Sequence, residues 1–234
     1  MKISAIAPMG RFYMFLLIAS ALLVFGFSSL SLAQEQRIDI NALIDETQKM
    51  SSSQDEMSMV WWLPEEFWLA NFAQDPSSTP EQAQQFVKVL NPYTVLCVID
   101  GLIGTFGGVT YHTEEFIREN IYIVDEKGTR YTPIKNKDLN ADTTNFLSMM
   151  KPLFVNMLGP MGENMHFYLF PSKTEDGERI AKVREYGNFT VKVNLNEYKW
   201  RLPLSSLMPP KICPEDGEKL NGAWKYCPWH GSKL

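Results

Sequence analysis

The sequence predicts a mainly β domain, an antiparallel sandwich or half-barrel with a helical insertion, preceded by short helices and followed by a small C-terminal tail. Three observations support this fold class. Residues 189–195 alternate between apolar and polar side chains, short apolar runs separated by turn residues follow one another from residue 93 onward, and one helical pattern interrupts them near residues 142–158. Strict alternation is typical of half-buried strands, and short strands around a lone helix are typical of antiparallel folds.

The first 33 residues have the pattern of a secretory signal peptide. They begin with the basic residues Lys2 and Arg11, and an uncharged, mostly apolar run follows at residues 12–27. Ser31 and Ala33 then supply the small residues of a cleavage site. This order of features favours cleavage and a periplasmic or secreted protein. The alternative is an uncleaved segment that anchors the chain in the inner membrane, since about 20 apolar residues span a bilayer.

Charge and composition limit the classes of partner. The full chain has a formal net charge of −5, and removal of residues 1–33 takes away Lys2 and Arg11 but no acidic residue, which leaves −7. A negative chain of this kind is not expected to bind nucleic acid. After signal cleavage, no remaining stretch is long and apolar enough to predict stable membrane insertion, and about 200 residues suffice for one main domain with appendages.

Residues 34–92 precede the predicted strands. Residues 34–58 form a polar N-terminal segment with one short amphipathic helix, and residues 59–92 predict short helices. The first of these begins at Pro64, a residue favoured in the first helical turn. The second begins at Thr79, which acts as N-cap with Gln82 as its capping-box partner.

Residues 93–208 predict the β-rich domain. The expected strands are Tyr93–Ile99, Phe116–Val124, Tyr131–Ile134, Met165–Phe170 and the alternating residues 189–195, prolonged to Leu202. The helical insertion near residues 142–158 contains Pro152, which is expected to kink or restart the helix. Cys97 lies inside an apolar run and is interpreted as a buried small hydrophobic residue. The glycine-rich run at residues 101–108 does not match a phosphate-binding loop and predicts a turn or kinked strand.

The C-terminal tail, residues 209–234, repeats one local pattern. Cys213-Pro214-Glu215-Asp216-Gly217 and Cys227-Pro228-Trp229-His230-Gly231 both read Cys-Pro-x-ligand-Gly. In each copy the second potential ligand follows the first by three residues, and the glycine behind it permits a positive φ angle. Two such turns supply the four side chains of a tetrahedral metal site, and Asn221-Gly222 between them predicts a hairpin that brings the turns together.

This tail resembles a zinc ribbon, although Asp216 and His230 stand where that family usually has cysteines. The resemblance implies a structural Zn²⁺ held by Cys213, Asp216, Cys227 and His230, and a role in structure or recognition. The alternative is a disulfide between Cys213 and Cys227, which an oxidising compartment would favour. A disulfide, however, requires neither the two additional ligands nor the matching glycines.

Two groups of residues outside the tail suggest further candidate sites. His112, Glu114 and Glu115 would form a metal or acid-base site if folding brought His166 near them, which would predict a metal-dependent hydrolase. The aromatic cluster Trp61, Trp62, Phe67 and Trp68 either packs a helix onto the sheet or lines a ligand groove.

The function expected from these observations is that of an exported, non-enzymatic interaction or structural protein with a C-terminal zinc-binding module. Its partner would be an unidentified protein or envelope component, and no catalytic residue is assigned. The alternative is an envelope protein that binds a small ligand or peptide in an aromatic-lined pocket, and the hydrolase is the least favoured of the three.

Overall fold

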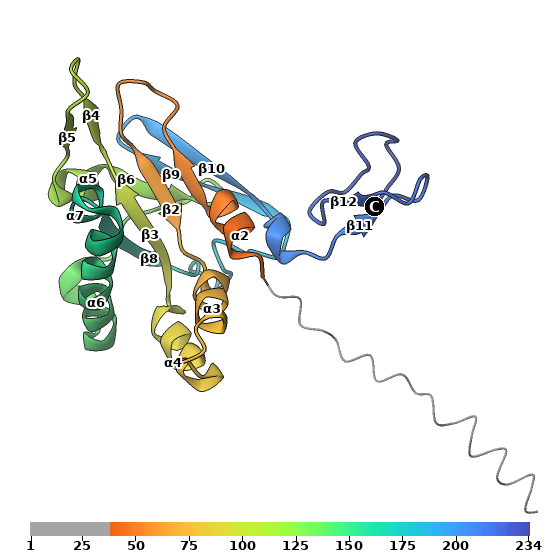
Figure 1. The fold of residues 1–234 in the computed structure, drawn as a ribbon, viewed down its shortest axis with the longest axis horizontal. Helices are drawn as coiled ribbons and strands as arrows, with labels where there is room; N and C mark the ends of the chain where they lie inside the picture. The colour runs from red at the N-terminus through yellow and green to blue at the C-terminus, as the bar shows by residue number, and fades with distance from the viewer. Residues whose placement is uncertain (1–37) are drawn as a thin grey trace, which may run out of the picture. The chain divides into compact units, whose positions relative to one another are not determined.

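The structure, a computed structural model, describes residues 38–234, and its strands form two four-stranded antiparallel sheets (Figure 1). The predicted signal peptide at residues 1–33 lies outside the described residues. The first sheet has the order β1-β2-β3-β8, with bounds Gln48–Met50, Met59–Trp62, Tyr93–Ile99 and His166–Pro171. The second sheet has the order β10-β9-β6-β7, with bounds Asn196–Leu202, Gly187–Val193, Ile121–Val124 and Arg130–Tyr131. The prediction of a mainly β, antiparallel fold with helical segments is confirmed.

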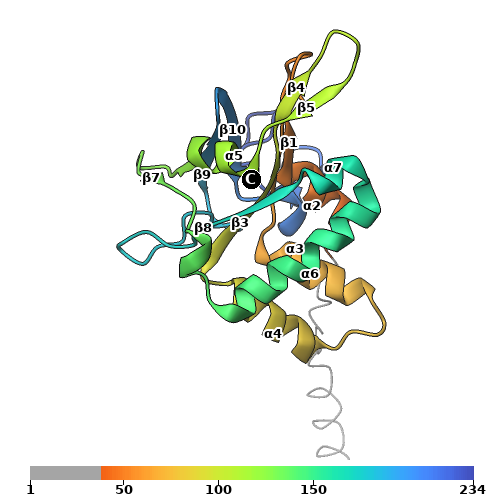
Figure 2. The same ribbon diagram turned by 90° about the vertical axis from the view of Figure 1, so that its left-hand side faces the viewer.

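The first sheet is the middle of three layers (Figures 1 and 2). Neighbouring residues of a strand point to opposite faces, and the two tryptophans of β2 show where each face packs. The Trp62 ring lies 4.9 Å from Phe189 of β9, edge-on, in the second sheet. The Trp61 ring packs on the other side against Phe67 and Phe154, with ring centroids 5.1 and 6.1 Å away, and both of these residues are helical. The aromatic cluster is therefore shared between two cores on opposite faces of one sheet.

The helices have the bounds Ile40–Thr47 (α2), Glu65–Gln74 (α3), Pro80–Leu90 (α4), Glu114–Asn120 (α5), Ala141–Leu158 (α6) and Pro160–Glu163 (α7). Of these, α3, α4 and α6 form the third layer. Rings of Trp68, Phe86 and Phe146 pack together, with centroids 4.9 to 5.5 Å apart, and tie α3, α4 and α6 to one another. The capping box expected at Thr79 and Gln82 is present at the start of α4.

Residues 59–62 differ from the expected helical segment. They form β2, which pairs with β1 and β3, and the helices begin only at Glu65. Pro64 serves as the N-cap of α3, so the chain before it is extended. Met-Val-Trp-Trp is also a sequence that fits a half-buried sheet surface better than a helix start.

The segment from Phe116 to Val124 is only partly the strand that its apolar residues predict. Helix α5 extends to Asn120, and strand β6 begins at Ile121. The helix starts because the Thr113 side chain accepts a hydrogen bond from the Phe116 N–H. In α6, Pro152 lies within one uninterrupted helix of 18 residues, so the expected restart of the helix does not occur.

Two hairpins bear on the predictions, one outside the two main sheets and one within the second sheet. The glycine-rich run forms the first, in which β4 (Gly101–Ile103) pairs with β5 (Val109–Tyr111), in agreement with the predicted turn (Figure 1). The second corrects an expectation, because residues 196–202 do not prolong β9 but return beside it as β10. Asn194 makes this turn with a φ of +53°, a conformation that asparagine tolerates better than most residues.

The C-terminal tail forms a small hairpin of its own, with β11 (Lys211–Ile212) paired to β12 (Lys219–Leu220). Cys97, on β3, is fully buried, as expected for a small hydrophobic residue, and burial raises the pKa of its thiol well above the ordinary value. Among residues 38–234, no helix has the length and hydropathy needed to cross a membrane.

Candidate metal centre

The two cysteine turns of the tail have the same backbone hydrogen bonds. In the first turn, the Cys213 N–H donates to the Glu218 carbonyl at 2.9 Å, and the Gly217 N–H donates to the Cys213 carbonyl at 2.9 Å. In the second turn the corresponding bonds, each of 2.8 Å, are Cys227 N–H to Ser232 O and Gly231 N–H to Cys227 O. The repeat found in the sequence is therefore also a repeat of backbone structure.

The glycines close both turns. Gly217 and Gly231 have φ angles of +77° and +70°, which place them in the left-handed region that other residues avoid. This conformation reverses the chain directly behind the second potential ligand. The second turn thereby brings Cys227 and His230 together, whereas in the first turn only Cys213 joins them.

Three of the four predicted ligands meet at one point. The sulfur atoms of Cys213 and Cys227 lie 3.6 Å apart, and His230 Nδ1 lies 3.3 Å from the first and 3.6 Å from the second. Among the described residues, these three side chains are the group whose ligand atoms lie close enough together to hold a metal ion. Both sulfurs are buried, whereas the imidazole is partly exposed.

The two thiols are not joined in a disulfide. Their sulfur separation of 3.6 Å compares with about 2.05 Å in a disulfide bond. Cys97, Cys213 and Cys227 are all free. The disulfide alternative is therefore not the state of this structure, and it becomes an outcome that the experiments below must distinguish.

Asp216 lies beside the group without belonging to it. Its Oδ2 atom is 3.8 Å from His230 Nδ1, and its Oδ1 atom accepts a hydrogen bond of 3.0 Å from the Glu218 N–H. One carboxylate oxygen is thus engaged by the turn while the other faces the three ligand atoms. Its role as the fourth ligand stays a prediction.

The turns also set the charge of the ligands. Burial opposes ionisation of Cys227, but the backbone N–H groups of His230 and Trp229 outweigh it and lower the pKa of this thiol. Burial raises the pKa of Cys213, and backbone N–H groups of its own turn offset only part of that effect. The hydrogen bond with Cys227 is the main cause that raises the pKa of His230. Without a metal, the turns therefore make the Cys227 thiol easier to ionise and the His230 imidazole easier to protonate than the same groups in water.

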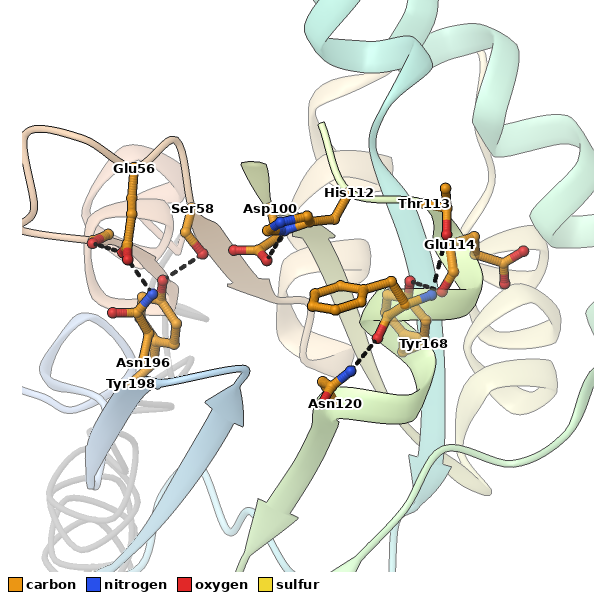
Figure 3. Close-up of polar contacts among 12 residues, drawn as sticks. Glu56, Ser58, Asp100, His112, Thr113, Glu114, Asn120, Tyr168, Asn196 and Tyr198 are labelled. Carbon is orange, nitrogen blue, oxygen red and sulfur yellow. Dashed lines mark hydrogen bonds and ion pairs between the residues drawn. The ribbon is translucent and has the colours of Figure 1, made fainter. Parts of the chain in front are cut away.

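The proposed cluster of His112 with Glu114, Glu115 and His166 is not assembled as a metal site within the described part of the chain. His112 instead directs Nδ1 to Asp100, with 2.7 Å between Nδ1 and Oδ2 (Figure 3). Asp100 is buried and follows β3 directly in the sequence, and His112 follows β5 directly. Their contact therefore fixes the base of the β4–β5 hairpin.

Two neighbouring hydrogen bonds connect the second sheet to the residues that precede β2 in the sequence (Figure 3). The Tyr198 hydroxyl donates to Ser58 Oγ at 2.7 Å, and the Asn196 side chain donates to a Glu56 carboxylate oxygen at 2.8 Å. Sequence analysis did not identify these polar residues.

A cavity of about 400 Å³ lies among α3, α4, the start of β3 and residues 179–185. Trp62 and Trp68 line it, whereas Trp61 is not among its lining residues. This is the kind of feature that the ligand-binding hypothesis requires.

Searches with this chain find no matching protein family, no matching curated protein and no matching solved structure.

Proposed function

We propose that this chain is an exported, non-enzymatic interaction or structural protein whose tail binds a structural Zn²⁺ and presents an aromatic surface to a protein or envelope partner. Thiolate sulfur and imidazole nitrogen are the ligands that Zn²⁺ prefers in structural sites. Bond lengths of about 2.3 Å to sulfur and 2.0–2.1 Å to nitrogen imply ligand separations of about 3.5–3.8 Å on a tetrahedron. The separations of 3.3 to 3.6 Å among Cys213, Cys227 and His230 are compatible with that geometry.

One observation carries the interaction part of the proposal, namely that the tail exposes its aromatic residues. Its buried cluster consists of Cys213, Leu220 and Cys227. Trp224, Tyr226 and Trp229 are instead 40, 60 and 71% exposed. Tryptophan and tyrosine are enriched in the contacts that dominate binding energy, so a module that leaves three of them uncovered fits a recognition role.

The rest of the molecule is compatible with this role. The negative charge argues against nucleic acid as the partner, and the predicted signal peptide argues for a periplasmic or secreted location. An uncleaved N-terminal anchor would change where the tail is displayed but not what it binds.

The test of the metal is the zinc content of the exported, purified protein, measured with a count of reactive thiols before and after chelation. We expect one Zn²⁺ per chain, and thiols of Cys213 and Cys227 that react only after chelation. Cys213→Ser and His230→Ala should abolish zinc binding, and Asp216→Asn should weaken it if the carboxylate is the fourth ligand. Cys97→Ala is the matched control and should retain the metal, because Cys97 lies in the core of the main domain.

Two outcomes would contradict the zinc site. Zinc content unaffected by Cys213→Ser would place the metal elsewhere. A metal-free protein whose two tail thiols react only after reduction would mean that Cys213 and Cys227 form a disulfide.

The test of the interaction is a photo-crosslinking amino acid placed at position 229 in the producing cells. Position 195 serves as the control, because Leu195 is also highly exposed but lies on the β9–β10 turn of the main domain. We expect a discrete adduct from position 229 that is lost in the Cys213→Ser background. Equal crosslinking from both positions, or none from position 229, would refute a recognition surface on the tail.

A further inference from the structure

The cavity beside α3 has the features of a ligand site in the main domain, remote in sequence from the tail. Its volume of about 400 Å³ falls within the range of about 300–1,000 Å³ that is typical of small-molecule sites. Its walls come from the first turn of α3, the end of α4, the start of β3 and the segment that leads into β9. Four separate parts of the chain thus converge on one space.

The inner part of the cavity is apolar. Trp62, Trp68, Leu90 and Val95 all line it, and each is no more than 5% exposed. These side chains belong to the cores on both faces of the first sheet, so they are fixed by packing. They offer a preformed surface for an aliphatic or aromatic group.

Glu66 is a carboxylate that the protein itself does not fully pair. Its side chain is only 18% exposed, and its nearest basic partner, Arg184 Nε, lies 4.0 Å from Oε1, at the limit of an ion pair. Burial raises the pKa of Glu66, because its own backbone N–H and the Arg184 charge offset only part of the desolvation. A largely buried carboxylate with one distant partner favours a ligand that brings a positive charge or a hydrogen-bond donor.

Two guanidinium groups occupy the facing segment. Arg184 donates one hydrogen bond to the Leu207 carbonyl, which anchors its side chain at the cavity. Arg179 makes a loose ion pair of 3.8 Å with Glu65. A guanidinium has five N–H donors, so both groups retain donors for a carboxylate ligand.

The charges around the cavity balance. Its charged lining residues are three acidic and three basic side chains, namely Glu65, Glu66 and Glu185 with Arg179, Lys182 and Arg184. A simple anion or a simple cation would therefore meet as much repulsion as attraction. A molecule that carries one charge of each sign matches the lining.

We propose that this cavity binds a zwitterionic ligand of amino-acid or dipeptide size. The ammonium group would face Glu66, the carboxylate would face Arg184 and Arg179, and an apolar side chain would lie against Trp62 and Trp68. This site goes beyond the proposed zinc-dependent role of the tail and does not depend on it.

The test is a calorimetric titration of the exported protein, as purified, with a panel of free amino acids and apolar dipeptides at up to millimolar concentration. For the tightest ligand, two analogues follow, one acetylated at its amine and one amidated at its carboxylate. We expect each analogue to bind at least about tenfold more weakly, as the loss of a charged hydrogen-bond partner implies. Failure of every panel member to saturate the protein, or equal binding of the two analogues and the parent, would overturn the proposal.

Variants assign the two ends of the ligand. Glu66→Gln should remove most of the discrimination against the acetylated analogue, and Arg184→Gln should remove most of the discrimination against the amidated one. Glu197→Gln is the control, since Glu197 lies on β10, pairs with Lys192 and does not line the cavity. Unchanged discrimination in Glu66→Gln would exclude Glu66 as the ammonium site, even if the ligand binds.

Chelation separates this inference from the proposed function. Ligand affinity should be the same before and after zinc is removed, because no tail residue lines the cavity. If the chelated protein still binds the ligand, the cavity site is independent of the metal. If the protein is purified without zinc and still binds the ligand, the metal centre is refuted and the cavity site stands.

Discussion

The main domain and the tail of this chain are stabilised by different means. The main core includes fully buried aromatic residues from both sheets, such as Tyr168, Phe170, Phe189 and Trp200, whereas the tail buries one leucine and two cysteines. Burial of a leucine contributes about 1.5–3 kcal/mol, but fixing the backbone costs about 1–2 kcal/mol per residue. The hydrophobic effect therefore accounts for the main domain but not for the tail, where the proposed metal ion would act as a cross-link.

The test with the largest expected effect on this comparison is removal of the proposed metal. Structural zinc contributes about 10–16 kcal/mol in isolated zinc-finger peptides, so chelation should release the tail almost completely. We expect the amides of Cys213, Gly217, Cys227 and Gly231 to lose their protection from hydrogen exchange, while the amides of β9 keep theirs. Exchange measured by mass spectrometry checks both regions in one experiment. Loss of protection in β9 would show that the two regions fold as one unit.

The reverse perturbation is a cavity in the main core. Phe189 is fully buried, stacks on Trp200 with 5.0 Å between ring centroids, and packs edge-on against Trp62. Phe189→Ala should lower the free energy of unfolding by about 3–5 kcal/mol, as large-to-small core changes do. Urea denaturation measures this loss, and zinc content should stay unchanged at temperatures where the variant is folded.

The control for the core variant is Leu195→Ala in the same hairpin. Leu195 is 89% exposed, so its truncation should change the free energy of unfolding by less than about 0.5 kcal/mol. A similar loss in both variants would mean that the hairpin, rather than the contact between the two sheets, determines the stability of the domain.

Glu46 stabilises the segment that joins the main domain to the tail. Its carboxylate accepts hydrogen bonds from the N–H groups of Ser205 and Ser206, at 2.8 and 2.9 Å, and from both hydroxyl groups. These bonds fasten the 3₁₀ turn Ser205–Leu207 to α2 just before the tail begins. Glu46→Gln should cost about 1–2 kcal/mol of unfolding free energy, since hydrogen bonds to a charged acceptor are lost. Asp45→Asn, an exposed neighbour on the same helix, is the matched control.

The same contact predicts a dependence on pH. Burial opposes ionisation of Glu46, but the hydrogen bonds from Ser205 and Ser206 outweigh it and lower the pKa in the folded protein below 4.5. Because the folded pKa is depressed, the stabilisation is fully present above the unfolded value of 4.5 and disappears as the pH falls through the folded pKa. The difference in unfolding free energy between wild type and Glu46→Gln should therefore narrow in acid. A difference that is constant with pH would exclude the carboxylate as the acceptor.

Local signals in the sequence predicted local structure well in both regions. The capping box at Thr79, the alternation of β9 and the paired cysteine turns each depend on residues within a few positions of one another. Competing local signals explain the errors. The apolar residues of α5 suggested a strand, whereas its cap at Thr113 and acidic first turn started a helix.

Contacts between distant segments could not be predicted in this way. The contacts of Tyr198 with Ser58 and of Asn196 with Glu56 depend on how strands from different parts of the chain meet. The cavity depends on four such segments, so composition indicated its tryptophans but not Glu66 or Arg184. The group of Cys213, Cys227 and His230 is the exception, because each of the two turns is complete within five residues and the chain between them is short.

The last prediction concerns the turn between β9 and β10, which the sequence did not indicate. Asn194 and Leu195 connect these strands, and the usual Asn-Gly signal is absent because the second position is leucine. Asn194 has a φ of +53°, so Asn194→Ala should cost about 1–2 kcal/mol, while Asn194→Gly should change the free energy of unfolding by less than about 0.5 kcal/mol. Urea denaturation of the two variants separates backbone strain from side-chain contacts. Equal losses in both would mean that the asparagine side chain, rather than its backbone conformation, holds the hairpin closed.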